Sequence, residues 1–217
     1  MVDNHRATVA LEVRTRVLAV ATRKFAAHGF DGTSLQAIAD EVGVTKPAVL
    51  HHFPSKEHLR AAVLEGILEH WRDTLPRLLL MATASEGRFD AVFGELYRFF
   101  ASEPDRARLV VREALDRPAE VKRMLRGPLK PTLDAVAGYI RRGQELGHHF
   151  ADVDAEAYVL HVLQMVLIAA ATLAVSPSAL GEGAPARRRY DREAARIAKT
   201  SLFHPRPREA PRERRTR

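Results

Sequence analysis

The amino-acid sequence predicts an all-α protein in which three N-terminal helices are joined by a long helix to a larger helical bundle. Three observations predict this fold class. Apolar residues recur at steps of three and four residues through most of the chain, which is the spacing of one helix face. No run of residues alternates between apolar and polar types, as a half-buried strand would. Glycine and proline stand mainly where helices would begin or end.

The N-terminal part contains three predicted helices of different length. Apolar residues line one face of residues 7–27, and Gly29 follows at a C-cap position. A second helix is expected over 33–42 and a short third helix over 45–52. The glycine between these two helices favours a tight turn, so they are expected to form a helical hairpin.

The rest of the chain is expected to be helical as well. Ser55 is suited to cap a long fourth helix that extends toward Ala84, and Pro76 within it is expected to kink or end that helix. Further helices are predicted over 88–102, 104–115, 118–126, 128–146, 154–175 and 186–203. Three of these ranges begin with proline, which suits a first helical position. The loop 176–185 is rich in glycine and proline.

Composition and charge limit the class of protein. The net charge is +7, and +4 of it comes from residues 204–217, which hold six arginines against two glutamates and are expected to form a basic disordered tail. Cysteine is absent, which excludes disulfides, thiolate metal sites and a cysteine nucleophile. The polar N-terminus has no apolar run of the signal-peptide type, so we expect a cytoplasmic protein.

Residues 157–175 need a separate interpretation, because they form a stretch of nineteen residues without a charge. This length is close to that of a membrane span. However, His161 and Gln164 lie within the stretch, and no second segment of this kind occurs. We therefore favour a helix buried in a bundle or at a subunit interface over a membrane segment.

The segment TSLQAIADEVGVTKPAVLHHF, residues 33–53, has the pattern of a helix-turn-helix motif. Thr33 and Gln36 have the spacing of a capping box, which predicts the start of the second helix. Gly43 is free to adopt positive φ in the turn. Thr45 can cap the third helix with its side-chain oxygen.

The outer face of the third helix is left with Lys46, Ala48, His51 and His52 once Val49 faces inward. A cation, a small methyl-bearing side chain and two flat donors or acceptors suit a groove of DNA. A plain helical hairpin on a protein surface has the same local pattern. The motif by itself therefore leaves both interpretations open.

The longer stretch from Arg16 to Leu59 resembles the tetracycline-repressor (TetR) family of bacterial regulators. The resemblance rests on RVLAVATRKFAAHGF, DGTSLQAIADEVGVTKPAVLHHF and PSKEHL. It implies a DNA-binding domain over 11–71, with its helix-turn-helix motif at 34–53, and a helical ligand-binding and dimerisation domain over 72–203. It also implies a homodimer joined by its last two long helices, double-stranded operator DNA as a partner, and a small-molecule effector.

The resemblance also implies roles for single residues. Thr33 resembles the phosphate contact at the start of the second helix, and Lys56 resembles the phosphate-binding lysine of the fourth. Further contacts to bases and backbone are implied for Thr45, Lys46, Pro47, Ala48, His51 and His52. Leu50 departs from the pattern, because the family commonly has tyrosine there and leucine cannot donate a hydrogen bond to a phosphate.

The ligand site is expected among the helices from Leu64 to Val175, since helical bundles build sites between their helices. The candidates are polar residues within otherwise apolar helices: Tyr97, Arg98, Arg112, Tyr139, His161 and Gln164. Each of them could equally be a rim, core or interface residue. His161 and Gln164 lie one turn apart and could instead bond across a dimer.

No enzymatic activity, metal or cofactor is expected. Glu145 and His148 have the Glu-x-x-His spacing of di-iron bundles, but only one copy occurs, and phosphate-binding and nucleophile motifs are absent. We expect a repressor that a small molecule releases from a palindromic operator, with the long fourth helix carrying the signal. The alternatives are a constitutive DNA-binding regulator without a ligand and an all-helical enzyme.

Overall fold

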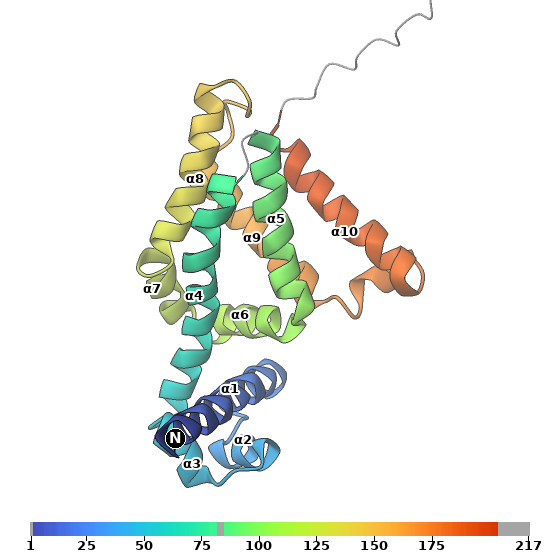
Figure 1. Ribbon diagram of the computed structural model, residues 1–217. Helices are drawn as coiled ribbons and strands as arrows, with labels where there is room; N and C mark the ends of the chain where they lie inside the picture. Colours follow the sequence, from blue (N-terminus) through green and yellow to red (C-terminus); the bar gives the residue numbers. More distant parts are fainter. Residues whose placement is uncertain (1, 82–84, 204–217) are drawn as a thin grey trace, which may run out of the picture.

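The computed structural model describes residues 2–81 and 85–203, and within these ranges every regular element is a helix (Figure 1). The helices in chain order are α1 (Val2–His28), α2 (Leu35–Val42), α3 (Lys46–His52), α4 (Lys56–Met81), α5 (Ser85–Ser102), α6 (Pro104–Asp116), α7 (Pro118–Arg126), α8 (Lys130–Glu145), α9 (Ala155–Ala171), the short 3-10 helix η1 (Ser176–Leu180) and α10 (Gly183–Thr200). The predicted all-α fold class is confirmed. The predicted tail over 204–217 lies outside the described residues.

Helices α1, α2 and α3 gather at one end of the molecule, and α4 runs from them into the bundle formed by α5–α10 (Figure 1). The N-terminal group has its own core, because each of its helices turns an apolar face inward. Phe25, Ile38 and Val49 are buried in this core, one from each helix. Leu59 of α4 and Leu109 of α6 enter the same core, so the bundle is packed directly against the N-terminal group.

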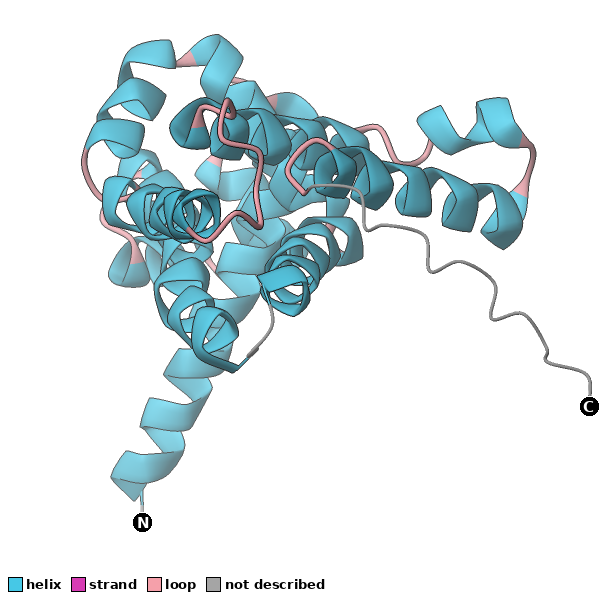
Figure 2. Ribbon diagram, turned by 90° about the horizontal axis from the view of Figure 1, so that it is seen from above, coloured by secondary structure: helices cyan, strands magenta, loops and turns pink. Residues whose placement is uncertain are grey.

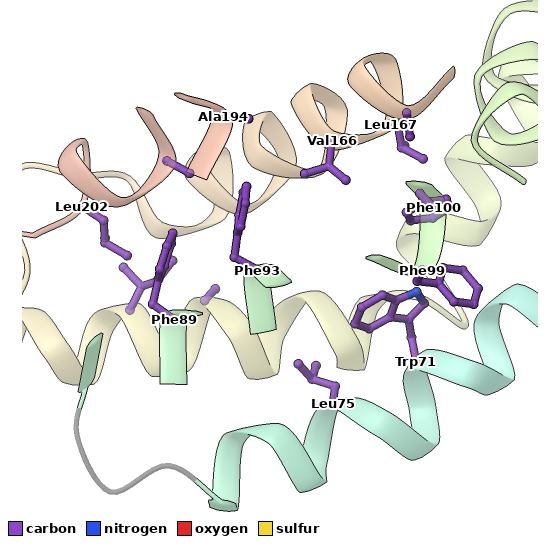
Figure 3. Packing of buried hydrophobic residues seen from close by; sticks show 14 of the residues in the cluster. Trp71, Leu75, Phe89, Phe93, Phe99, Phe100, Val166, Leu167, Ala194 and Leu202 are labelled. Carbon is purple, nitrogen blue, oxygen red and sulfur yellow. The ribbon is translucent and has the colours of Figure 1, made fainter. Parts of the chain in front are cut away.

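Helix α4 contributes to two cores. Its first turns place Leu59 and Val63 in the N-terminal core. Its later turns place Trp71 and Leu75 in the core of the bundle (Figure 3). One continuous helix therefore lies against both parts of the molecule, as the sequence predicts.

The helix continues through Pro76 to Met81, so the prediction that Pro76 could end it is wrong. A proline inside a helix removes one backbone hydrogen bond and costs about 3 kcal/mol or more. Pro76 itself is exposed, while Leu75 and Leu79 beside it pack against the bundle. This apolar burial offsets the missing bond and keeps the last turns of α4 helical.

Aromatic side chains fill the core of the bundle. Phe89 and Phe93 of α5 point toward α9 and α10 (Figure 3). Farther along the same helix, Phe99 meets Trp71 edge to face with ring centroids 5.7 Å apart. Phe99 also meets Phe100 edge to face at 5.0 Å. Such tilted pairs place the positive edge of one ring on the negative face of the other, which favours this packing.

The C-terminal end of the bundle is less compact. Helix η1 and the first turns of α10 project from the body and form an arm, residues 176–190 (Figure 2). The end of α10 returns to the body, where Phe150 N–H donates to the carbonyl of Leu202. This backbone bond anchors the C-terminal end of α10 to the body of the molecule.

Several helix ends differ from the prediction. Helix α8 begins at Lys130 rather than at Pro128, because residues 127–130 form a turn in which Lys130 N–H donates to the carbonyl of Gly127. Helix α9 starts where predicted, with Asp154 accepting a hydrogen bond from Ala157 N–H, but it ends at Ala171 instead of continuing to 175. In the described part of the chain, no helix has the length and apolar character needed to cross a membrane.

Candidate nucleic-acid interface and groove

Local hydrogen bonds and one glycine fix the conformation of the α2–turn–α3 segment. Ser34 caps α2, because its hydroxyl oxygen accepts a hydrogen bond from Ala37 N–H at 3.0 Å. Gly43 lies in the turn with φ 77°, a left-handed conformation that glycine adopts without steric cost. Thr45 caps α3 by accepting from Ala48 N–H at 3.3 Å. The predicted roles of Gly43 and Thr45 are confirmed.

The predicted capping box at the start of α2 is wrong. Ser34 is the capping residue, and the Gln36 side chain donates to Asp40 instead of reaching back to the cap. Thr33 lies one residue outside the helix and is buried, with its hydroxyl within donating distance of the carbonyls of Gly29 and Lys24. Its side chain therefore holds the end of α1, and the phosphate contact implied by the resemblance stays a prediction.

The outer face of α3 carries side chains that have no partner within the described part of the chain. Lys46 and His51 are exposed, and no hydrogen bond or ion pair involves them. His52 is half-buried, and its ring lies 5.5 Å from that of His51 in an edge-to-face arrangement. Pro47 is exposed and Ala48 half-buried. These side chains can contact a groove without first breaking bonds within the protein.

The opposite face of α3 is anchored. Val49 is fully buried, as predicted, and Leu50 is half-buried. The helix is therefore held by its apolar side and presents its polar side outward. A helix fixed in this way can enter the major groove of B-DNA, which is wide enough to admit one helix.

Lys56 does not offer the free ammonium group that the resemblance implies. Its Nζ donates hydrogen bonds to the carbonyl oxygens of Phe30 at 2.8 Å and Thr33 at 3.0 Å. The same Nζ lies 4.2 Å from the centre of the Phe30 ring. These contacts fasten the α1–α2 turn to α4, and the phosphate contact of Lys56 stays a prediction.

Two residues near α3 are candidates that the sequence prediction missed. Ser34 is exposed at the N-terminus of α2, where free backbone N–H groups and the helix dipole favour a phosphate. Arg14 of α1 is exposed, with its guanidinium carbon 5.4 Å from the ring of Phe53 just after α3. A threonine–serine pair does not reveal which residue caps the helix, and the approach of α1 to α3 is a long-range contact.

Two of the predicted ligand residues line one groove. Tyr97 and Arg98 lie on the face of α5 that looks toward α10, and the groove between the two helices has a volume of about 570 Å³. Its lining is mainly apolar and includes the small residues Gly94, Ala101 and Ala195.

The Tyr97 hydroxyl donates a hydrogen bond to Asp191, which Arg187 also binds at 2.9 Å. Burial and the neighbouring Asp191 carboxylate raise the pKa of Tyr97, so the hydroxyl remains protonated. The groove therefore has a fixed polar pair beside an apolar floor.

The other four ligand candidates do not line this groove, and their ligand role stays a prediction. Arg112 of α6 approaches α1, where it donates to the carbonyl of Ala27 at 3.4 Å. Tyr139 packs edge to face against His149, with ring centroids 5.2 Å apart. His161 and Gln164 are exposed on the outer face of α9, on the side away from the aromatic core. Large apolar residues also occur on this outer face, so sequence periodicity alone did not show which face of the helix is buried.

The outer face of α9 exposes large apolar side chains that no described residue covers. Ile168 is 50% exposed and Leu160 is 37% exposed, on the same side as His161 and Gln164. Ile197 of α10 is likewise exposed. Exposed apolar side chains of this kind make the surface a candidate for contact with another molecule.

Comparison with known proteins supports the DNA-binding interpretation of the N-terminal group. Residues 17–63 match the family model described as bacterial regulatory proteins, tetR family. The chain is 33% identical over 134 residues to the HTH-type transcriptional regulator RutR of Escherichia coli, a match that covers 59% of this chain and 62% of RutR. It is 26% identical over 140 residues to the HTH-type transcriptional activator FasR of Mycolicibacterium smegmatis, covering 64% of each chain.

The fold is also found among solved structures. The ketosteroid transcriptional regulator KstR2 of Mycobacterium tuberculosis superposes with a TM-score of 0.70, covering 88% of this chain and 95% of that one at 17% identity. At this identity the likeness concerns the fold alone. It extends over the bundle as well as the N-terminal group, whereas the family model covers only the latter.

Proposed function

Because the chain belongs to the TetR family of bacterial regulatory proteins, we propose that it is a homodimeric transcriptional regulator that binds an inverted-repeat operator and responds to a small molecule. The family is one of regulators and not of enzymes. Its relatives include a repressor, KstR2 of Rhodococcus jostii, and an activator, FasR. Repression with release by the ligand is the mode that we propose here.

The observation that carries the proposal is the unpaired outer face of α3. Lys46, His51 and His52 extend from a short helix whose inner face is locked into the N-terminal core by Val49. The start of the helix is fixed by Thr45 and the turn before it by Gly43. A rigid element with free donors and a cation is the arrangement needed to read base edges in the major groove.

Dimerisation is the role that we propose for the outer face of α9. A two-fold axis brings the same patch of both chains together, which would cover Leu160 and Ile168 with their counterparts. His161 and Gln164 then lie within the interface and can bond across it. Two copies of α3 would face successive turns of one side of the DNA, about 34–36 Å apart or a multiple of that spacing.

The groove between α5 and α10 is the effector site that we propose. Its apolar floor and the fixed Tyr97–Asp191 pair suit a molecule with an apolar body and one polar group. The aromatic core beside it is filled by packed rings such as Phe93 and Phe99. A constitutive regulator without a ligand is the second candidate, since the groove is open to solvent.

Binding of purified protein to operator DNA tests the proposal. The probe is a duplex selected from random sequences by the wild-type chain, and affinity is measured by fluorescence anisotropy. We expect Lys46→Ala or His52→Ala to weaken specific binding by about 1–3 kcal/mol, the range for losing one base contact. Lys122→Ala is the control, because Lys122 is also an exposed lysine but lies on α7 and not on α3. Equal affinity for all four proteins would refute the assignment of α3.

A further inference from the structure

A cluster of charged side chains surrounds one aromatic ring where the N-terminal group meets α6 and α7. Its members come from the α1–α2 turn, α4, α6 and the α6–α7 region: Phe30, Lys56, Arg60, Glu113, Arg117 and Glu120. We refer to these six residues as the ionic cluster. It lies apart from the outer face of α3 and from the α5–α10 groove, and neither DNA contact nor effector contact accounts for it.

Arg60 occupies the centre of the ionic cluster. The residue is only 8% exposed, and its guanidinium donates one hydrogen bond to Glu113 of α6 and another to Glu120 of α7. Glu113 is buried as well. Charges removed from water are costly unless they are paired with good geometry. The two bonds therefore strongly favour the one arrangement of α4, α6 and α7 in which both can form.

The same guanidinium also contacts the N-terminal group. The ring of Phe30 has Lys56 Nζ at 4.2 Å, the Arg117 guanidinium carbon at 4.4 Å and that of Arg60 at 5.5 Å from its centre. Cations are attracted to the negative face of an aromatic ring. Phe30 lies in the turn that leads into α2, so the turn before the helix-turn-helix motif is held by the ionic cluster.

The outer members of the ionic cluster strengthen this connection. Arg117 forms ion pairs with Asp31 at 3.8 Å and with Glu120 at 3.7 Å, so it joins the α1–α2 turn to α7. Burial raises the pKa of Glu113, whereas the hydrogen bond from Arg60 lowers the pKa of Glu120. The Arg60 guanidinium and its neighbours thus connect the α1–α2 turn, α4, α6 and α7.

We propose that Arg60 is a positioning residue for operator binding, because its bonds to α6 and α7 fix the direction in which the N-terminal group presents α3. This inference rests on the proposed function and adds to it the contact that would transmit a displacement of α6 to the DNA-binding surface. Helix α6 packs against both α1 and α5, and α5 forms one wall of the groove. A ligand that favours another position of α6 would alter the bond between Arg60 and Glu113, and with it the spacing of the two α3 helices.

Distance measurement within one chain tests the proposal directly. The protein contains no cysteine, so Ala19→Cys on α1 and Ala135→Cys on α8, both at exposed positions, carry spin labels at those two sites only. Labelled chains are mixed with an excess of unlabelled wild-type chains, so that pairs between subunits do not contribute. The distribution of label distances by pulsed electron paramagnetic resonance then reports the orientation of the N-terminal group relative to the bundle.

Three variants of Arg60 are compared in the full-length labelled chain. Arg60→Met removes the cation, and Arg60→Met combined with Glu113→Met also removes the carboxylate that would be left buried and unpaired. Arg60→Lys keeps the charge but cannot bond two carboxylates with a planar fork. The control is Arg72→Met, which removes an arginine of the same helix whose partner, Glu65, is exposed.

The wild-type chain and the Arg72 control are expected to give one narrow distance distribution. Both methionine variants are expected to give a broad distribution without a single maximum. The distribution of Arg60→Lys is expected to be wider than that of the wild type and narrower than those of the methionine variants. Affinity for the selected DNA should fall about ten-fold in the methionine variants, within the range typical of coupling between two sites.

A purely stabilising role would lower the melting temperature without broadening the distribution in chains that circular dichroism shows to be folded. A distribution as narrow as that of the wild type in every folded Arg60 variant would overturn the proposal. If both methionine variants unfold, the width of the distance distribution of Arg60→Lys decides: a width equal to that of the wild type would overturn the proposal. Failure of the wild-type chain to bind any DNA would instead refute the proposed function.

Discussion

Helices α1–α3 and helices α9–α10 bury their apolar residues to different extents. In the N-terminal group, the apolar residues that line the inner faces are buried, as Phe25, Ile38 and Val49 show. In the C-terminal part, Ile168 of α9 and Ile197 of α10 are about half exposed. One region completes its core within a single chain, whereas the other leaves large apolar side chains on its surface.

This difference relates to what each region is proposed to do. A recognition helix must be rigid before it meets DNA, and rigidity follows from a closed core. A dimer interface must stay uncovered until the partner arrives, and a two-fold interface needs the same patch on both chains. The regions should therefore respond differently to substitution, the first by unfolding and the second by dissociation.

Removal of a core side chain should have the largest effect in the N-terminal group. Phe25 is 1% exposed, so Phe25→Ala leaves a cavity and should lower the free energy of unfolding by about 3–5 kcal/mol. Urea unfolding followed by circular dichroism measures the change. A loss below about 1 kcal/mol would show that the region tolerates cavities, which contradicts a closed core.

A charge on the outer face of α9 should separate the subunits without unfolding them. Ile168→Glu places a carboxylate in the proposed interface, and the dissociation constant should rise at least about ten-fold, or 1.4 kcal/mol. Light scattering over a concentration series measures the change. Leu80→Glu is the matched control, because Leu80 is 82% exposed near the end of α4. Equal dissociation constants for the two variants would place the interface elsewhere.

The turn of the helix-turn-helix motif can be tested by a pair of glycine substitutions. Gly43 has φ 77°, and a side chain there would meet no atom within 4 Å, so Gly43→Ala costs only the backbone strain of about 1–2 kcal/mol. Gly66 lies within α4 and is equally unobstructed, so Gly66→Ala should stabilise the protein by about 0.5–1 kcal/mol. Thermal unfolding of the two variants should thus give shifts of opposite sign. Shifts of the same sign would contradict the left-handed conformation of Gly43.

Substitution of His149, whose ring packs edge to face against Phe203 just after α10 at 4.7 Å, should give a smaller effect that depends on pH. Burial lowers the pKa of His149 below its ordinary value of 6.5, so below that pH the unfolded chain binds a proton that the folded chain does not. The stability contributed by neutral His149 is present above pH 6.5 and is lost as the pH falls. Melting temperatures between pH 7.5 and 5.5 should decline more steeply for the wild type than for His149→Phe. Parallel declines would show that His149 does not contribute.

Local signals explain which parts of the candidate site could be predicted from the sequence. The roles of Gly43, Thr45 and Val49 follow from residues within one or two turns, and the structure has them as expected. The same holds for the capping role of Ser55, whose hydroxyl accepts from His58 N–H at 3.2 Å. Each of these assignments needs only helix geometry and the hydrogen-bonding capacity of one side chain.

Contacts between distant segments could not be predicted from the sequence. Lys56 bonds the carbonyl of Phe30, twenty-six residues earlier, and Arg112 bonds that of Ala27. No periodicity in the sequence records such a pairing. The ligand role of His161 and Gln164 stays a prediction, and the structure places both residues on the exposed face of α9.

Selection of DNA from a random pool by the full-length protein tests operator recognition by α3 most directly. We expect enrichment of an inverted repeat whose half-sites are centred about 10 base pairs apart, or a multiple of that, because two α3 helices related by a two-fold axis face the same side of the duplex. Under the same conditions Lys46→Ala should enrich the repeat weakly or not at all, while Lys122→Ala should enrich it fully. Absence of enrichment by the wild-type protein, or an unchanged repeat with Lys46→Ala, would contradict recognition through this helix.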